Sequence, residues 1–327
     1  MPTRWQLDEF DALFAARVGS RPVGIEWPEI LAFRNAPTFL DVVLRYDAIS
    51  GPFYGNHFIL NKVVPEAWRF QMIVFLLHLH DTRDPADPRG GLTLANFQRV
   101  CATLGLASAG RAFAFLNIMR VGGYLARDLA DADRRIVRLE PTPHFVETVE
   151  QWNDGIFELI DTAMPTAGLV AARAQVPGLG RMMRQGGAEK LLAGWQPLGA
   201  FPEVEHFAAR DGGWMLLARA MALALRQDDG TPVTIDLIAF GKEFGTSRTQ
   251  LRRILESAHA AGLLLAPPQN GSNICPSPKL ACAFVTWLAS YLASYCESAT
   301  AALATGGVAQ PSYPNNEESA VSRNATG

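Results

Sequence analysis

The chain has 327 residues, of which 49% are hydrophobic and 19% charged, a composition typical of a globular protein long enough for two domains. Its four cysteines include no CxxC pair, which excludes a disulfide framework and favours reduced thiols in the cytoplasm. The net charge of −3 excludes a protein that is basic throughout, although a local basic face on an acidic body still binds nucleic acid.

Residues 1–62 are expected to form an N-terminal helical segment. The first stretch, "MPTRWQLDEFDALFAARVG", places acids among its apolar positions and lacks the apolar core of a signal peptide, so a cytoplasmic protein is expected. Helices are predicted near residues 5–17 and 38–48. A Pro- and Gly-rich connection is expected between them, and "SGPFYGNH" is expected to form a loop after the second helix.

Residues 63–162 form the first of two predicted units. The opening helix, 67–80, is apolar almost all round and is therefore expected in the core. Thr93 and Ser108 then each begin a helix, and Gly122-Gly123 ends the second one. The residues of this second helix that are expected to face inward are Ala112, Phe115, Leu116 and Met119. Two short strands, starting at Tyr124 and in "RIVRL", and a helix over 143–162 complete the unit.

Residues 163–212 are rich in Gly and Pro and are predicted to connect the units through short helices. The second unit, 213–303, ends in a helix over 279–298. Its stretch "LACAFVTWLASYLASYC" carries no charge and is long enough for a marginal membrane span. The Thr, Ser and Tyr residues in it, with no basic cluster beside it, favour a buried helix instead, so no membrane partner is expected. The tail, 304–327, consists mostly of small and polar residues and is expected to be disordered.

The two units are predicted to be copies of one another, beginning at Trp68 and at Trp214. Aligning Ser108 with Ser247 also places Gly123 on Gly262 without a gap, so the second helices match in length and in their end signal. A helix pair followed by a hairpin is typical of a winged helix-turn-helix, which makes duplex DNA the first partner to consider. The predicted fold is mainly α, with tandem winged helix-turn-helix units and small β-hairpin wings that form an internal pseudo-dimer.

The second copy carries the residue types that a DNA recognition helix needs at its N-terminal, outward positions. Arg suits guanine or phosphate, and Gln suits adenine, because their side chains offer paired hydrogen-bonding groups. The alternative is a solvated basic helix face that touches no DNA. The candidate contact residues in this copy are Ser247, Arg248, Thr249, Gln250, Arg252 and Arg253.

The first copy has fewer candidate DNA-contact residues in its predicted recognition helix and more arginines in its predicted wing. In its helix Ser108, Arg111 and Asn117 are candidates for DNA contact, whereas an exposed Phe113 more often packs on a neighbouring surface than on a base. A wing arginine enters a narrow minor groove, where an aspartate can hold it in place. An ordinary charged hairpin is the alternative, and the second wing, "APPQNGSNICPSP", has no basic residue. The wing candidates are Arg127, Asp133, Arg134, Arg135 and Arg138.

Two segments carry a family resemblance. "ADADRRIVRLEPTP" resembles the wing of the MarR (multiple antibiotic resistance regulator) repressors, and "IDLIAFGKEFGTSRTQLRRILESAHAAGLL" resembles their helix-turn-helix. The resemblance implies regulation of transcription by operator binding, usually as a homodimer and often relieved by a small aromatic or phenolic ligand. It places recognition helices over 108–122 and 247–261 and the wing arginine at Arg134 or Arg135. Pro141 stands where the family has Leu, and the second wing lacks the Asp-Arg pair.

Catalytic and metal motifs are absent from the sequence. No HExxH, Gly-x-Ser-x-Gly, phosphate-binding loop or GxGxxG occurs, so neither an enzyme nor a cofactor is expected. His78 and His80 diverge on a helix, so no shared metal site is expected. Two interpretations remain open. One is a DNA-binding transcriptional regulator, a monomer or homodimer, in which one copy reads DNA through its helix and the other through its wing. The other is a tandem winged-helix module that docks proteins and binds DNA weakly or not at all.

Overall fold

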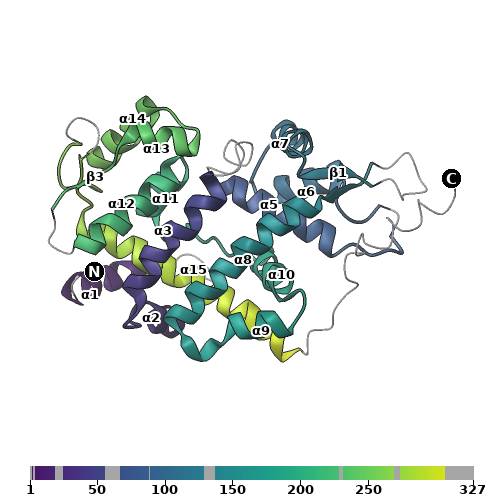
Figure 1. The fold of residues 1–327 in the computed structure, drawn as a ribbon, viewed down its shortest axis with the longest axis horizontal. Helices are drawn as coiled ribbons and strands as arrows, with labels where there is room; N and C mark the ends of the chain where they lie inside the picture. The colour runs from purple at the N-terminus through teal and green to yellow at the C-terminus, as the bar shows by residue number, and fades with distance from the viewer. Residues whose placement is uncertain are drawn as a thin grey trace, which may run out of the picture.

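The computed structural model describes residue 2 and residues 4–18, 25–55, 67–87, 89–128, 137–227, 231–268 and 273–305. Helices make up most of this part of the chain, accompanied by two small antiparallel sheets of two strands each (Figure 1). The predicted mainly α class is therefore confirmed. The tail predicted to be disordered lies outside the described residues from position 306 onward.

The N-terminal segment differs from the prediction. Between α1 (Arg4–Val18) and α3 (Phe39–Gly55) lies a further helix, α2 (Trp27–Arg34), where a connection was expected. Pro28 lies in the first turn of α2, where its missing N–H costs nothing, so a proline here starts a helix rather than preventing one. Helix α3 also continues through the predicted loop to Gly55. It packs against α8 and α12, and such tertiary packing overrides the local Gly and Pro signals.

The helices of the two predicted copies come in the same order, but their strands differ. The elements of the first copy are α5 (Ala67–Asp81), α6 (Leu94–Thr103), α7 (Ala109–Val121), β1 (Leu125–Arg127), β2 (Leu139–Pro141) and α8 (Pro143–Ala163). Those of the second are α12 (Gly213–Gln227), β3 (Val233–Thr234), α13 (Leu237–Phe244), α14 (Arg248–Ala260), β4 (Asn273–Ile274) and α15 (Pro278–Ala304). The place of β3 is taken in the first copy by an isolated bridge between Thr93 and Arg138, and the place of β1 is taken in the second copy by one between Leu264 and Pro276. Strand β1 pairs with β2, Ala126 facing Glu140, and β3 pairs with β4, Val233 facing Ile274.

Both ends of α7 and α14 follow the sequence signals. Ser108 caps α7 and Ser247 caps α14, each accepting a hydrogen bond from the backbone N–H three residues later. Beyond the helix ends, Gly123 and Gly262 have φ angles of 77° and 71°, in the left-handed region that favours glycine. The alignment of the two copies predicted from the sequence is therefore confirmed at both ends of these helices.

The same positions are buried in the two helices. The buried residues of α7 are Ala112, Phe115, Leu116 and Met119, as predicted, and those of α14 are Leu251, Ile254, Leu255 and Ala258. The spacing within the two sets is identical, so each helix presents the same face to its own core and the same face to solvent.

The connector joins the copies through a shared core. It contains the short 3₁₀ helix η1 (Pro165–Ala167), α9 (Leu169–Gln175), α10 (Leu179–Leu192) and α11 (Pro202–Ala208), as the prediction of short helices requires. Helix α10 packs against both α5 and α15, one from each copy. A single cluster of buried apolar side chains extends from Phe10 in α1 to Ala299 in α15, so the two copies share one core.

Helix α15 runs through the middle of the molecule (Figure 1) and is buried without interruption from Cys282 to Tyr295. The prediction that this charge-free stretch lies between protein layers is therefore confirmed. Among the described residues, no individual helix has the length and apolar character that crossing a membrane requires, although the pair 143–163 and 165–175, bent by 118°, meets both criteria when taken together.

The glycines at the two ends of α7 predict opposite effects on stability. Gly123→Ala forces a side chain into a left-handed conformation and is expected to lower the free energy of unfolding by about 1 kcal/mol. Gly110→Ala, inside the same helix and with open space around its Cβ, is expected to raise it by about 0.5 kcal/mol. Urea denaturation measures both. Equal effects of the two substitutions would contradict the assigned helix end.

Candidate functional site

The exposed face of α14 carries the candidate DNA-contact residues that the sequence predicted for the second copy. Three buried residues, Leu251, Ile254 and Leu255, hold the helix against its core, so the other side faces solvent. Arg248, Thr249, Arg252 and Arg253 are exposed and line a shallow depression together with Glu256, while Gln250 is half-buried. The structure therefore brings the predicted residues of this copy together on one surface, here called the α14 face.

The positive charge of the α14 face is partly neutralised from within. Arg252 Nε lies 2.7 Å from Glu256 Oε1, one helical turn away, and both side chains are exposed. Arg253 forms no ion pair within the described part of the chain, so its charge is available to an anionic partner. Asp236 fixes the start of the preceding helix, α13, because its carboxylate accepts hydrogen bonds from the Ala239 and Ile238 amides, which lower its pKa.

The exposed side of α7 is richer in apolar side chains, although Arg120 is exposed there as well. Phe113 and Ile118 are 51% and 46% exposed, and Val121 is 83% exposed. Of the predicted contact residues, Ser108 and Arg111 are exposed and Asn117 is half-buried. Phe113 and Arg252 occupy equivalent positions in the aligned helices, so the two copies present different chemistry from the same place. In Figure 1, α7 and α14 both lie along the upper edge of the molecule.

The predicted wing is only partly placed by the structure. Arg127 is exposed on β1. Asp133, Arg134 and Arg135 lie outside the described residues. Arg138 is described, and its side chain is only 3% exposed.

The position of Arg138 corrects the prediction that it contacts DNA. Its Nε donates a hydrogen bond to the carbonyl oxygen of Gly90, and its guanidinium lies 3.8 Å from the buried carboxylate of Asp128. Arg83 also donates to that carboxylate, at 3.3 Å. Residue 138 forms an isolated bridge with Thr93 and directly precedes β2, and its side chain is buried. Arg138 therefore anchors the end of the β1–β2 pair from inside the protein.

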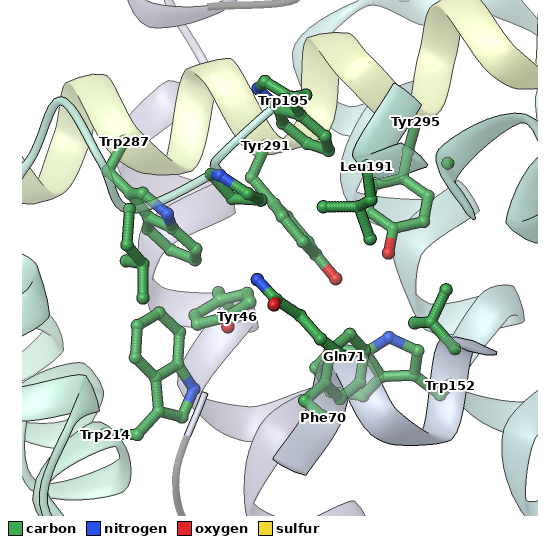
Figure 2. A pocket seen from close by; sticks show the side chains of 14 residues that line it. Tyr46, Phe70, Gln71, Trp152, Leu191, Trp195, Trp214, Trp287, Tyr291 and Tyr295 are labelled. Atoms are coloured by element: carbon green, nitrogen blue, oxygen red, sulfur yellow. The ribbon is translucent and has the colours of Figure 1, made fainter. Parts of the chain in front are cut away.

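The structure also contains a cavity that the sequence did not predict, here called the aromatic cavity. Its free interior volume is about 80 Å³, and the space reaches about 750 Å³ only when the open solvent at its mouth is included. Its walls include Tyr46 from α3, Trp152 from α8, Trp214 from α12, and Trp287, Tyr291 and Tyr295 from α15. Figure 2 shows Trp152 and Trp287 on opposite sides, with the Gln71 side chain reaching between Tyr46 and Tyr291. Elements from both copies therefore meet around one space.

One sequence signal does point to this cavity. Trp287, Tyr291 and Tyr295 are spaced four residues apart, which places them on one face of α15. Their ring centroids lie 5.3 Å and 4.6 Å apart along the helix. The remaining walls come from distant parts of the chain, and no local pattern connects them to this stripe.

Neither reactive thiols nor a metal centre emerge from the described residues. Burial raises the pKa of the Cys101 and Cys282 thiols to about 11, so both are inert at neutral pH. In the same part of the chain, no group of three or more His, Cys, Asp or Glu side chains is arranged to hold a metal ion.

The two described wing arginines predict different effects on folding. Arg138→Ala leaves the buried Asp128 carboxylate with one ion-pair partner fewer and is expected to destabilise the protein by about 3 kcal/mol. Arg127→Ala removes the same charge from the surface of the neighbouring strand and is expected to change stability by less than about 0.5 kcal/mol. Thermal unfolding compares the two. A stable Arg138→Ala variant would show that the buried arginine does not support the wing.

The comparisons of this chain with family models, with curated proteins and with solved structures returned no significant match. The MarR resemblance of two segments therefore stays a prediction. The function of the α14 face and of the aromatic cavity has to be inferred from their own chemistry.

Proposed function

We propose that this protein is a DNA-binding transcriptional regulator that contacts duplex DNA through two non-equivalent, MarR-like winged helix-turn-helix units. The observation that carries the proposal is the α14 face. It is a cluster of exposed arginines on the second helix of a helix-turn-helix, fixed in place by a buried apolar stripe. The two units form an internal pseudo-dimer, so one chain supplies both halves of the DNA-binding surface.

The order of elements supports the winged-helix part of the proposal. In the second unit α12, β3, α13 and α14 are followed by an extended stretch in which Leu264 forms a bridge with Pro276, next to β4. The first unit has the same order, with a bridge between Thr93 and Arg138 at the place of the first strand. A helix-turn-helix with an attached small antiparallel sheet is the architecture in which the second helix enters the major groove.

The chemistry of the α14 face supports DNA as the partner. Base edges are read from the N-terminal turns of a recognition helix, and Arg248, Thr249 and Gln250 occupy that turn. Arg252 and Arg253 lie one turn further, where a guanidinium binds the phosphate backbone. Within this unit the helix supplies the arginines, so α14 contributes most of the affinity.

The first unit contributes differently. Helix α7 offers two exposed arginines, Arg111 near its start and Arg120 near its end, with exposed apolar side chains between them, so its unit contacts DNA mainly through the wing and Arg127. Because the two halves use different elements, the preferred DNA site is asymmetric, since the symmetry of a site mirrors that of the protein. In Figure 1, α7 and α14 lie along the same upper edge of the view, as a duplex that contacts both units requires.

The apolar face of α7 favours a second candidate function, a protein-docking module. Three large apolar side chains on one exposed helix face, Phe113, Ile118 and Val121, are unusual for a surface that only contacts phosphates. Binding to such a face depends on apolar burial and weakens little with salt, whereas phosphate binding weakens steeply.

Selection from a pool of random duplex DNA, at low and at moderate salt, tests the proposed function. Enrichment of one asymmetric motif is expected. Two equivalent half-sites would contradict the unequal roles of the units. Retention without a motif and only at low salt, or no retention, would favour the docking module instead.

Point variants of the α14 face sharpen this test. Arg253→Ala is expected to weaken DNA binding roughly tenfold at low salt. It is also expected to reduce the slope of log K against log salt concentration by about one, because about one counterion fewer is released on binding. Glu256→Gln is expected to strengthen binding, because it removes a carboxylate that repels phosphate and holds Arg252. Fluorescence anisotropy with the selected duplex measures both.

Arg173→Ala is the charge control, since it removes the same charge from α9, at the lower edge of the view in Figure 1. Because Arg173 pairs with Glu150 and Asp154, thermal unfolding of this variant is measured alongside its DNA binding. Equal weakening by Arg173→Ala and Arg253→Ala would mean that only net charge matters and that α14 is not the contact surface.

A further inference from the structure

We propose that α7 reads the 5-methyl groups of thymines in the major groove, so that the half of the DNA site next to the first unit is rich in thymine. This inference rests on the proposed function and names the base chemistry that the first unit selects. One end of the site is then read by apolar contacts from α7, and the other end by hydrogen bonds from the arginines of α14.

Large apolar side chains on α7 are exposed where a DNA-reading helix contacts its partner. Helix α7 packs against α6 and β1 through its buried residues, and Phe113, Ile118 and Val121 are exposed on its remaining surface. Because apolar surface in contact with water is unfavourable, burying these side chains against a partner yields free energy. Phe113 occupies the position of Arg252 in α14, so we infer that both helices face the same partner.

The first two turns of α7 carry mostly side chains that form no hydrogen bonds. The exposed residues there are Ala109, Gly110, Phe113 and Ala114, together with Arg111. The positions equivalent to the first four hold three arginines and a threonine in α14. Recognition helices contact base edges through these turns. Alanine and phenylalanine side chains suit one base-edge group in particular, the thymine methyl, which projects into the major groove.

The charges around α7 favour DNA over an apolar protein surface as this partner. Residues 94–127, from α6 to β1, contain four arginines and no acidic residue, although the whole chain has a net charge of −3. Arg111 and Arg120 are exposed and nine residues apart, which places them on opposite flanks of the helix. The major groove is bordered by the phosphates of both strands. A guanidinium on each flank therefore meets one strand while the apolar side chains between them face the bases.

A close approach of DNA also explains Gly110. Glycine inside a helix lowers stability relative to alanine, and no atom lies within 4 Å of a Cβ built at this position. The packing of the protein itself therefore gives no reason for a glycine here. A base edge lying against the first turn of α7 does give one, because a larger side chain would hold the helix away from the groove.

Selection from two pools of random duplex DNA, one with thymine and one with deoxyuridine in its place, tests the inference. Deoxyuridine pairs as thymine does and lacks only the methyl group. From the thymine pool we expect an asymmetric motif with one thymine-rich half. From the deoxyuridine pool we expect only the other half to be enriched, because α14 reads that half by hydrogen bonds. A motif without a thymine-rich half, or the same complete motif from both pools, would overturn the inference.

Single replacements in the selected duplex measure the size of the effect. Each thymine replaced by deoxyuridine in the thymine-rich half is expected to weaken binding about three- to fourfold, as the loss of one buried methyl group predicts. The same replacement in the other half is the matched control and is expected to leave the affinity nearly unchanged. Fluorescence anisotropy measures both. Equal effects in the two halves would contradict the assignment of methyl reading to α7.

Phe113→Ala connects the methyl effect to the helix. This variant is expected to bind the thymine duplex about tenfold more weakly, with an unchanged slope of log K against log salt concentration, because no charge is lost. The deoxyuridine effect is expected to disappear at the thymine that Phe113 contacts. Val170→Ala, which removes an exposed apolar side chain from α9, is the matched control and retains the effect. A full effect at every thymine in Phe113→Ala would mean that the methyl groups act through the shape of the duplex.

Gly110→Leu separates contact with DNA from a role in folding. Leucine has a higher helix propensity than glycine, and its Cβ meets no atom within 4 Å, so the free energy of unfolding is expected to rise. DNA binding is expected to weaken at least about tenfold, because the side chain obstructs the approach of α7 to the groove. Unchanged DNA binding would place α7 outside the groove and favour the docking module.

The outcomes distinguish this inference from the proposed function on which it rests. If neither pool is retained at low salt, the protein does not bind duplex DNA, and both proposals are overturned. If DNA is bound with a motif and the deoxyuridine replacements have no effect, only the reading of thymine methyl groups by α7 is overturned.

Discussion

The burial of α15 on all sides between Cys282 and Tyr295 is the constraint on which the rest of the structure depends. A helix surrounded by protein cannot carry unpaired charge, and the stretch from Leu280 to Cys296 has none. Helices α1 and α2 cover one part of the surface of α15, and α8, α10 and α11 cover other parts of it. The N-terminal segment is therefore necessary to the second unit, although the two lie at opposite ends of the sequence.

The surroundings of α15 are fixed by polar contacts at its edges. Arg34 of α2 pairs with Asp11 of α1 through two contacts of 2.5 Å and 2.7 Å and also donates to the buried Thr286 hydroxyl. Near the start of α15, the buried Glu203 carboxylate contacts both Arg17 and Lys279. Although burial opposes it, hydrogen bonding from Arg17 keeps the pKa of Glu203 low, so the carboxylate stays charged. These contacts determine which helices lie side by side, a choice that apolar packing alone leaves open.

The sequence predicted those features of the fold that depend on residues close together in the chain. The caps at Ser108 and Ser247, the glycines that end α7 and α14, and the buried faces of both helices follow from signals a few residues apart. The sequence did not predict α2, because its stability comes from packing on α15. It also placed Arg138 outside, because charge in a hairpin suggests exposure, and only the tertiary position of Asp128 turns the side chain inward. The aromatic cavity combines α3, α8, α12 and α15, so no local pattern contains it.

The shared core has a consequence for how the two copies can change. In a symmetric dimer of separate chains each substitution occurs twice, so a helix surface cannot alter on one side only. Here Phe113 and Arg252 occupy equivalent positions in one chain, so a mutation can replace either residue without changing the other. The pairing of the copies is also unaffected by dilution, because no association equilibrium separates them. Even a single molecule at the lowest level of expression therefore carries both surfaces, and each is free to acquire its own specificity.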